Sequence, residues 1–574
     1  MVNLLPLLSA LLLTSQAVEA APAWPATGGG SSVNDQCGNK LGAVASESSI
    51  CSDIGIDVLK AGGNAADSMV ATVFCVGVIG MYHSGIGGGG FMLARHSNGT
   101  YEFIDFRETM PAAGYQDMYN NNTNSSIYTG LASGVPGEIR GLQHLHENYG
   151  VLPWETLVMP AALVARDGFP VTQDLVRYMK SATTGLDNFL VDEPTWAIDF
   201  APNGTLLGLG DTITRKRYAD TLESIAKRGP DAFYTGPIAQ ATIDIINSTG
   251  GIMTMADLKN YTVAIRPPSS ISYRDYKITS GSAPSSGTVL ASVMKIIEGY
   301  TTIGEAATLN LSTHLFDEAV RFGYGQRSEL GDPSFVKSMD AYQADMLTEA
   351  TAAAVRARIS PQHTLNVSAY DPSGFESLAT PGTSAVVTSD KSGMTISLTT
   401  TVNLLFGSHI MVPETGVILN DEMNDFSIPG SSNAFGYIPS PSNYIRPGKR
   451  PLSSITPTIV EHAANGSVYF AVAAAGGSRI ITAALQTLWH VLDQNMTAPQ
   501  ALAQPRFHDQ LVPNQISFEW AYDNQTVAFM QERGHNVTWV APGQSTAQSL
   551  RLLGNGTFEA AGEPRQLNSG GYAV

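Results

Sequence analysis

A threonine that follows a Pro-Gly pair is the residue of this sequence best suited to act as a nucleophile. Residues 379–390 read ATPGTSAVVTSD, so Thr383 separates Gly382 from an apolar run typical of a buried strand. If the chain were cut between these two residues, the new α-amino group of Thr383 could take the proton of its own hydroxyl near neutral pH. Gly382 has no side chain and would leave the scissile carbonyl open to attack. The alternative is an ordinary strand that starts after a turn.

Two glycines could supply the hydrogen-bond donors that such a nucleophile needs. In AVAAAGGSRIITAAL, a strand-like run ends in Gly476 and Gly477, and a helical pattern follows. Backbone N–H groups at a helix N-terminus can stabilise an oxyanion. An ordinary tight turn would have the same sequence.

Charged and hydroxyl residues elsewhere could hold a substrate that carries both charges of an amino acid. Glu422 and Asp425, in LNDEMNDFSIPG, could clamp an ammonium group or belong to an exposed acidic loop. Ser453 and Ser454, in RPGKRPLSSITP, could donate to a carboxylate, although serines in loops are usually solvated. Arg107, in DFRETMP, could bind the same carboxylate through two N–H groups or form a surface ion pair.

Several familiar catalytic motifs are missing. The run GIGGGG at 85–90 satisfies G-x-G-x-x-G, but a helical pattern precedes it and a strand follows, the reverse of a dinucleotide-binding unit. We expect its glycines to let two backbones approach closely. No G-x-S-x-G, H-E-x-x-H or C-x-x-C motif occurs, which excludes the commonest serine hydrolases, zinc proteases and thiol oxidoreductases; we expect neither a cofactor nor a metal. The net charge of -18 argues against a nucleic-acid partner.

The elements that must position these residues change character along the chain. Apolar spacing predicts two packed helices over 51–63 and 64–80, and an Asn-Gly turn predicts a hairpin over 91–107. Helical patterns dominate from there to about residue 360. A long Pro, Ser, Gly and Thr-rich loop covers 360–382, and strand-like runs prevail after it.

The N-terminus and many glycosylation sequons indicate the secretory pathway. An apolar run, Leu4 to Leu13, is too short to span a bilayer, and Val18-Glu19-Ala20 resembles a cleavage site, so we expect a signal peptide at 1–20, or an anchor if it is retained. The product would be extracellular, cell-wall bound or vacuolar. Sequons occur at Asn98, Asn121, Asn124, Asn203, Asn247, Asn260, Asn310, Asn366, Asn465, Asn495, Asn524, Asn536 and Asn555.

Three cysteines are too few for a disulfide scaffold. In an oxidising compartment one pair can close and one thiol is left over. We expect Cys51 to pair with Cys75, and the fate of Cys37 is open.

Taken together, these motifs resemble the gamma-glutamyltransferase family, whose members are N-terminal nucleophile hydrolases. The resemblance runs from about Gly42 to the C-terminus and rests on SGIGGGGF, DFRETMP, TTVNLLFGS, LNDEMNDFS, RPGKRPLSSITPTIV and AAAGGSRI, in family order. It implies an α/β (α+β) fold, an αββα sandwich of stacked antiparallel sheets between helical layers. It also implies cleavage at Gly382–Thr383 into a large chain, 21–382, and a small chain, 383–574, that stay together as a heterodimer.

The resemblance further implies a role for each site residue. Thr383 would attack the γ-carbonyl of glutathione, its S-conjugates or other γ-glutamyl compounds and pass the γ-glutamyl group to water or to an amino acid or peptide acceptor. Thr401 would be the hydroxyl partner of the nucleophile. The remaining roles follow residue by residue: the amine side would be contacted by Asn403, Glu422 and Asp425, the α-carboxylate by Arg107, Ser453 and Ser454, and the oxyanion by Gly476 and Gly477.

One departure and two alternatives remain. Ala385 stands where animal members carry a histidine, so no imidazole acts there, and the lid-like loop 433–450 offers Tyr437 and Tyr444 without indicating which covers the site. A related acylase for glutaryl or poly-γ-glutamyl amides would keep the fold; a glutaryl substrate has no ammonium and would not need Glu422 with Asp425. An inactive secreted binding glycoprotein would be expected to lose the nucleophile or the Gly-Gly turn.

Overall fold

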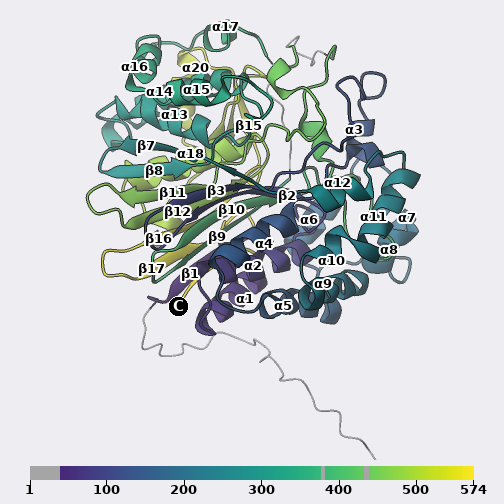
Figure 1. The fold of residues 1–574 in the computed structure, drawn as a ribbon. Helices are drawn as coiled ribbons and strands as arrows, with labels where there is room; N and C mark the ends of the chain where they lie inside the picture. The colour runs from purple at the N-terminus through teal and green to yellow at the C-terminus, as the bar shows by residue number, and fades with distance from the viewer. Residues whose placement is uncertain (1–38, 376–381, 432–437) are drawn as a thin grey trace, which may run out of the picture. The chain divides into compact units, whose positions relative to one another are not determined.

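Two large antiparallel sheets lie face to face between two layers of helices (Figure 1). The computed structural model describes residues 39–375, 382–431 and 438–574. The expected signal peptide at 1–20, Cys37 and Tyr437 lie outside the described residues. The arrangement confirms the predicted fold class.

The first sheet has seven strands and carries the region of Thr383. Its order is β18 (Gly570–Ala573), β1 (Gly42–Ser46), β9 (Ser384–Asp390), β10 (Thr395–Thr401), β2 (Gly89–Arg95), β3 (Tyr101–Asp105) and β6 (Ala264–Arg266). The second sheet has six strands, in the order β17 (Phe558–Ala561), β16 (Thr546–Leu552), β12 (Val468–Ala475), β11 (Thr458–His462), β8 (Tyr276–Ser280) and β7 (Ser269–Tyr273).

The remaining strands of the described residues form two small sheets. They are β4 (Phe169–Pro170) with β5 (Thr212–Ile213), and β13 (Phe507–His508) with β14 (Ile516–Glu519) and β15 (Val537–Val540).

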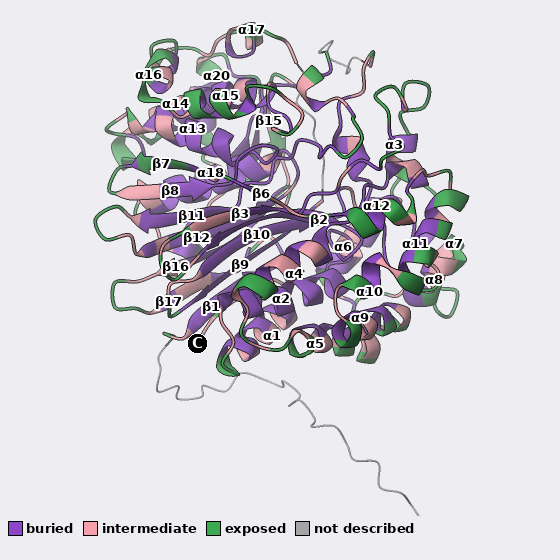
Figure 2. Ribbon diagram, in the orientation of Figure 1, coloured by how far each residue is buried: buried purple, intermediate pink, exposed green. Residues whose placement is uncertain are grey.

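Strand β9 is buried on both faces, which explains its unbroken apolar run. Val386 packs into the core beneath the first helical layer, whereas Ala385 and Val387 pack into the core shared with the second sheet. Figure 2 shows the same burial along both sheets, with exposed residues gathered on the outer helices. The nucleophile candidate therefore precedes an interior strand.

Hydroxyl side chains join the two sheets at β10. Ser397 Oγ donates to the carbonyl of Val472 at 2.8 Å, and Thr399 Oγ1 donates to that of Ala474 at 3.3 Å. These two buried hydroxyls thus have backbone partners in β12, while the Thr400 hydroxyl donates to the Glu138 carboxylate and the Thr401 hydroxyl accepts from the Asn403 N–H. The polar run SLTTT can form a buried strand for this reason.

Helices cover the outer face of each sheet (Figure 1). On the first sheet lie α1 (Ser49–Lys60), α2 (Ala65–Ile79) and α4 (Glu138–Tyr149); α5 (Trp154–Asp167) packs outside α2, and α9 (Lys216–Arg228) packs against α5. On the second lie α13 (Gly287–Glu298) and α18 (Arg479–Leu492). Against α13 pack α14 (Leu309–Arg327), α15 (Met339–Met346) and α16 (Glu349–Arg356), and against α14 pack α17 (Val367–Tyr370) and α20 (Asn524–Glu532). The other helices are α3 (Ser125–Tyr128), α6 (Gln173–Thr183), α7 (Phe189–Asp192), α8 (Pro194–Phe200), α10 (Asp231–Tyr234), α11 (Gly236–Ser248), α12 (Met255–Asn260) and α19 (Ala498–Ala503).

Helix α2 shows how the local sequence sets an element. Asn64 caps it by accepting from the N–H groups of Ala66 and Asp67, and Asp67 accepts in return from the Asn64 N–H at 3.0 Å. All of its residues are buried, as expected for a helix that is apolar on every side.

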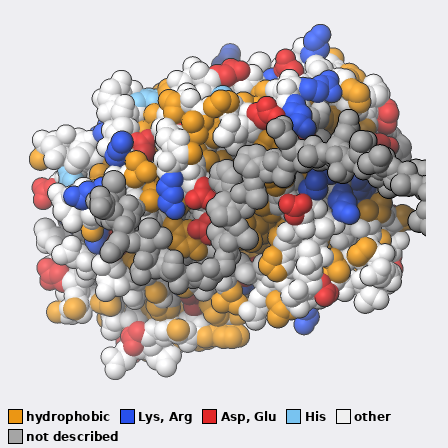
Figure 3. All heavy atoms as spheres, turned by 90° about the horizontal axis from the view of Figure 1, so that it is seen from below, with side chains coloured by type: hydrophobic (Ala, Val, Ile, Leu, Met, Phe, Trp, Pro, Cys, Tyr) orange, Lys and Arg blue, Asp and Glu red, His pale blue; other side chains and the backbone are white. Residues whose placement is uncertain are grey.

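The sequence-based prediction of elements was incomplete between residues 264 and 280. There the structure has β6, β7 and β8 inside a stretch that was expected to be helical. No helix in the described residues is long and apolar enough to cross a membrane. On the face seen in Figure 3, acidic and basic side chains are interspersed among apolar and uncharged ones.

Candidate active site

Thr383 is the residue immediately before β9, and its backbone conformation is strained. Its φ of +154° is rarely adopted by a β-branched residue, and Gly382 before it has a φ of +124°. The register pairs Ser384 with Thr400, so Thr383 lies next to Thr401 at the same end of the sheet. The structure is that of the uncut chain, with strain at the bond that is predicted to break.

Only glycine fits at position 382. A Cβ atom there would lie 2.0 Å from the carbonyl oxygen of Asn403. The close approach holds the peptide bond between Gly382 and Thr383 against the end of β10. Gly88, in the glycine-rich run, is equally constrained: its Cβ would lie 2.0 Å from the carbonyl oxygen of Thr401. The expected close approach of two backbones is confirmed there.

Residues from distant parts of the chain line one pocket around Thr383. Of the predicted site residues, it is lined by Arg107, Gly382, Thr383, Thr401, Asn403, Glu422, Asp425, Ser453, Ser454 and Gly477. Gly476 lines a second cavity, which shares Gly382 and Thr383 with the first. The structure thus brings together every predicted site residue apart from the disulfide.

Three buried charges form the polar end of the pocket. Arg107 contacts the Glu422 carboxylate through Nη1 and lies 2.5 Å from Asp425 Oδ2 through Nη2. The three side chains are at most 8% exposed. The cation and the anions are therefore adjacent. A site that binds an ammonium and a carboxylate attached to the same carbon needs opposite charges this close together. Asp425 Oδ1 has no hydrogen-bond partner among the described residues.

Burial governs the ionisation of these groups. It raises the pKa of Glu422 well above its ordinary value, and the Arg107 charge offsets part of that rise. Burial alone would lower the pKa of Arg107, but Glu422 and Asp425 raise it, so the guanidinium stays charged. The neighbouring Glu108 has its pKa raised by burial to about 8. These raised pKa values favour the protonated, neutral forms of Glu422 and Glu108 near neutral pH, and an ammonium ion bound beside them would favour their ionised forms.

Backbone contacts hold the serine segment in place. Ser453 N–H donates to the carbonyl of Pro284 at 2.8 Å, and Ser286 Oγ donates to the carbonyl of Ser453 at 2.6 Å. Arg107 Nε donates to the Pro451 carbonyl at 3.4 Å. The guanidinium thus bridges the acidic pair and the serine segment, where a carboxylate could be bound by both.

The hydroxyl of Thr401 and the side chain of Asn403 are oriented by the loop that follows β10. Thr401 Oγ1 accepts from the Asn403 N–H at 2.7 Å, and Asn403 Nδ2 donates to the Asp421 carbonyl at 3.0 Å. The amide oxygen of Asn403 is then the atom able to accept from an ammonium group.

The Gly-Gly turn joins β12 to α18, as predicted. Gly476 and Gly477 have φ values of +124° and +59°, and α18 begins at Arg479. A Cβ on Gly476 would lie 2.7 Å from the carbonyl oxygen of Gln544. The N-terminus of a 14-residue helix therefore faces the site, where its dipole favours negative charge.

Comparison with known proteins decides the family. The sequence matches the model of the family described as gamma-glutamyltranspeptidase over residues 51–573. It is 56% identical to a glutathione hydrolase proenzyme of Arthroderma benhamiae, over 93% of both chains, and 50% identical to a glutathione hydrolase of Aspergillus flavus, over 93% of this chain and 90% of that one. This chain belongs to the gamma-glutamyltranspeptidase family.

Solved structures agree with this membership. A cephalosporin acylase from Bacillus halodurans covers 97% of this chain and 99% of its own with a TM-score of 0.80; at 23% identity it shows the fold alone. A gamma-glutamyltranspeptidase from Helicobacter pylori matches at 32% identity with a TM-score of 0.52, over 56% of this chain and 92% of that one.

Sequence reasoning missed several polar residues of this family member's pocket, among them Arg327 and Asn443. Arg327, in the last turn of α14, lines the pocket, as does Asn443, whose Nδ2 donates to the Asp425 carbonyl at 2.7 Å. A cation in the last turn of a helix is ordinary, and an isolated asparagine in a loop has no distinguishing pattern. No sequence signal pointed to either.

Of the two tyrosines in the lid-like loop 433–450, Tyr444 lies among the described residues. Tyr444 is half-buried, its hydroxyl donates to the Pro439 carbonyl at 3.3 Å, and it is not among the residues that line the pocket. Ala385 is buried in the core between the sheets, where it has no access to the pocket.

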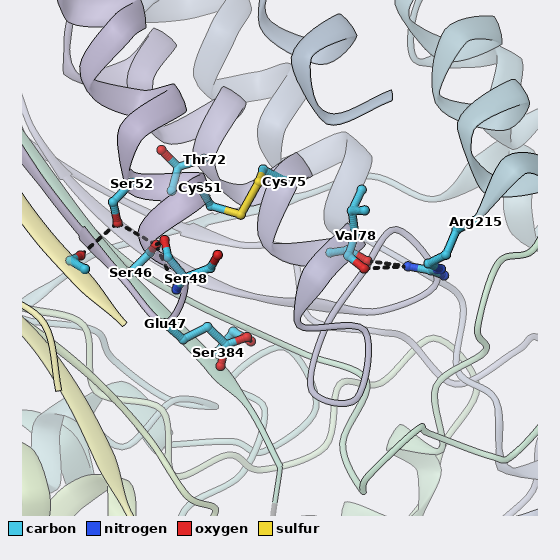
Figure 4. The surroundings of a disulfide bond; sticks show 12 residues. Ser46, Glu47, Ser48, Cys51, Ser52, Thr72, Cys75, Val78, Arg215 and Ser384 are labelled. Carbon is cyan, nitrogen blue, oxygen red and sulfur yellow. Dashed lines mark hydrogen bonds between the residues drawn. A yellow bond between two sulfur atoms is a disulfide. The ribbon is translucent and has the colours of Figure 1, made fainter. Parts of the chain in front are cut away.

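A disulfide between Cys51 and Cys75 joins α1 to α2, as predicted (Figure 4). The same view shows Glu47 beside Ser384, whose Oγ donates to Glu47 Oε1 at 2.7 Å. The loop that leads into α1 is thereby attached to the residue that follows Thr383.

Proposed function

We propose that this chain is a self-cleaving γ-glutamyltransferase that acts on glutathione, its S-conjugates and other γ-glutamyl compounds. One observation carries the proposal: Thr383 is at a strained Gly-Thr bond in the same pocket as adjacent buried groups of opposite charge. The names of its relatives, glutathione hydrolase proenzyme and glutathione hydrolase, support the substrate and the cutting of a precursor.

Self-cleavage begins with attack of Thr383 Oγ on the Gly382 carbonyl. An ester forms between them, the amide C–N bond breaks, and its nitrogen takes the hydroxyl proton to become the α-amine of Thr383. Water then hydrolyses the ester to a Gly382 carboxylate and a free hydroxyl. Relief of the unfavourable φ at Thr383 favours this direction.

Turnover repeats the chemistry on a bound substrate. The new amine takes the proton of Thr383 Oγ, which attacks the γ-carbonyl, while the N–H groups of Gly476 and Gly477 stabilise the oxyanion. The leaving amine departs with that proton and a γ-glutamyl ester remains. Water or an acceptor amine then resolves the ester. Binding of the charged head to Arg107, Asp425 and their neighbours is used to orient the carbonyl.

The two product chains would remain a heterodimer. Residues 21–382 would supply β1, β2, β3 and β6 to the first sheet, and residues 383–574 would supply β9, β10 and β18. Cutting between Gly382 and Thr383 leaves that sheet with strands of both chains hydrogen-bonded side by side. Separation would expose its core, so the chains are expected to stay together.

N-terminal sequencing of the purified protein, beside a denaturing gel, tests the proposal. We expect a chain that begins Thr-Ser-Ala-Val-Val, and we expect Thr383→Ala to remain one uncut chain while Thr383→Ser still cuts. Efficient cutting of Thr383→Ala at the same bond would refute self-processing. The wild type should also release p-nitroaniline from γ-glutamyl-p-nitroanilide; a cut protein that does not would refute the substrate class.

Entry into the secretory pathway is the localisation that we propose. The disulfide between Cys51 and Cys75 supports it, because such bonds persist in oxidising compartments. The surface position of the sequon asparagines supports it independently.

A further inference from the structure

A second cavity begins where the first ends, at the nucleophile. Gly382 and Thr383 line both cavities, whereas Gly477 lines the first and Gly476 the second. The Gly476–Gly477 turn, whose N–H groups are proposed to stabilise the oxyanion, therefore lies on the boundary between the two cavities. An acyl group held in the first cavity has its carbonyl at Thr383, so the amine that leaves it must project to another side of that residue.

One loop lies against both the Gly476–Gly477 turn and Arg177. Residues 541–546 line the cavity, and the carbonyl of Gln544 is the close neighbour of Gly476 described above. Further along the same loop, a Cβ on Gly543 would lie 3.1 Å from Arg177 Nη1. Gly543 also has a φ of +93°, a backbone conformation that favours glycine, whereas the flexible tip of Arg177 could move aside for a Cβ.

Among the described residues that line this cavity, Arg177, on α6, is the only lysine or arginine. Its guanidinium stacks over the Tyr178 ring at 4.5 Å, and Nη2 donates to the Tyr178 hydroxyl at 2.7 Å, which fixes its orientation. Asp174 lies 3.2 Å from Nη2 and is itself almost fully buried. The Arg177 side chain is 39% exposed and so can meet a second anion at the cavity.

We propose that the second cavity binds the leaving half of a γ-glutamyl peptide, and that Arg177 binds the free carboxylate at its C-terminus. The proposal rests on the γ-glutamyl transfer proposed above. For glutathione the leaving half is a dipeptide, and two extended residues span about 7 Å from the γ-carbonyl to that carboxylate. An acceptor dipeptide, whose amine must approach the ester from the same side, would use the same contact. Arg177 is thus a specificity residue outside the acyl-binding pocket.

The test compares substrates that share the γ-glutamyl head and differ in the leaving group. Glutathione has the terminal carboxylate, glutathione glycine ethyl ester has it blocked, and γ-glutamyl-p-nitroanilide lacks the dipeptide altogether. For Arg177→Gln we expect kcat/KM to fall about 10-fold or more on glutathione, mostly through KM, and to change less than about 2-fold on the other two. Arg177→Lys should keep part of the preference for glutathione over its ester.

Lys180→Gln, which removes an exposed cation one turn along α6, is the matched control and should leave all three activities unchanged. Equal losses on all three substrates would overturn the proposal, because the change would then act on folding or on the nucleophile. Unchanged activity on glutathione would overturn it as well. A wild-type protein that cleaves none of the three substrates would instead reject the proposed function itself. Cleavage of γ-glutamyl-p-nitroanilide tests that function separately, because this substrate lacks the dipeptide that Arg177 is proposed to bind.

Discussion

At the scale of single residues, Asp425 is the group whose removal separates recognition from folding. Asn at this position keeps the shape but not the charge, while Arg107 keeps its contact with Glu422. We expect Asp425→Asn to lower kcat/KM on γ-glutamyl-p-nitroanilide about 100-fold, on the order of 3 kcal/mol, as for a lost charge-assisted hydrogen bond. Steady-state kinetics on the cut protein measures this.

A substrate without the ammonium group provides the control. Glutaryl-p-nitroanilide differs from the γ-glutamyl compound in the missing amine, so its slow cleavage should be indifferent to Asp425→Asn. Equal losses on both substrates would show that Asp425 supports the fold rather than the ammonium contact. A wild type that prefers the glutaryl compound would favour the acylase alternative.

Glu108 should make stability depend on pH. Burial raises its pKa to about 8, whereas a glutamate in an unfolded chain titrates near 4.3. Between these values the folded protein holds a proton that the unfolded chain has released, so this contribution to stability is present at low pH and is lost as pH rises through 8. Glu108→Gln mimics the protonated form. It should raise the thermal midpoint at pH 8.5 more than at pH 5.

Thermal unfolding of the uncut Thr383→Ala chain is the appropriate measurement, because it follows a single polypeptide. Glu414→Gln, on the surface, is the matched control and should shift neither midpoint. A Glu108→Gln shift that is equal at both pH values would mean that packing, not titration, determines it.

The chemistry of the site was largely predictable from residue types, but its contacts were not. Thr383, the acidic pair and the serines stand in recognisable local patterns. That Arg107 is ion-paired to the acidic pair, and that Arg327 lines the pocket, depends on elements that meet only in the folded chain. Local sequence does not encode such long-range proximity.

At the scale of elements, the glycine run preceding β2 sets the position of Thr401. Because a Cβ on Gly88 would lie 2.0 Å from the Thr401 carbonyl oxygen, Gly88→Ala must push β10 away from β2. Overpacking of this kind costs about 1–3 kcal/mol. We expect a lower thermal midpoint and slower self-cleavage, read on a gel over time. Gly554→Ala, which meets nothing within 4 Å, should change neither, and similar effects of both variants would contradict the argument.

Elements with strong local signals were predicted well. The capped helix α2, the helix α18 after Gly477 and the β2–β3 hairpin appear where periodicity and turn residues indicated. The strands β7 and β8 were missed because each has only five residues and their alternation is short. The pairing of β8 with β11, nearly two hundred residues away, and of β7 with β8 stabilises these strands more than local propensity does.

At the scale of the whole molecule, the sequons can be compared with the surface of the fold. Every sequon asparagine is exposed or half-buried. Chance placement would bury some of them, since most of the sheet and helix residues are buried (Figure 2). Asn98, Asn465 and Asn555 each lie in a hairpin turn, and the Oδ1 of each accepts from the hydroxyl of its own sequon. A glycan at these sites would extend into solvent.

We therefore expect N-glycans on the protein produced by a secreting eukaryotic host. Treatment with peptide N-glycosidase should lower its apparent mass, and peptide mapping in heavy-oxygen water should mark Asn98, Asn465 and Asn555. Asn310 should be marked least, because it is half-buried and its Oδ1 accepts from Thr526 Oγ1 at 2.7 Å. A secreted, active protein with no mass change would contradict the interpretation of the sequons. Strong marking of Asn310 alone would contradict the argument from the folded surface.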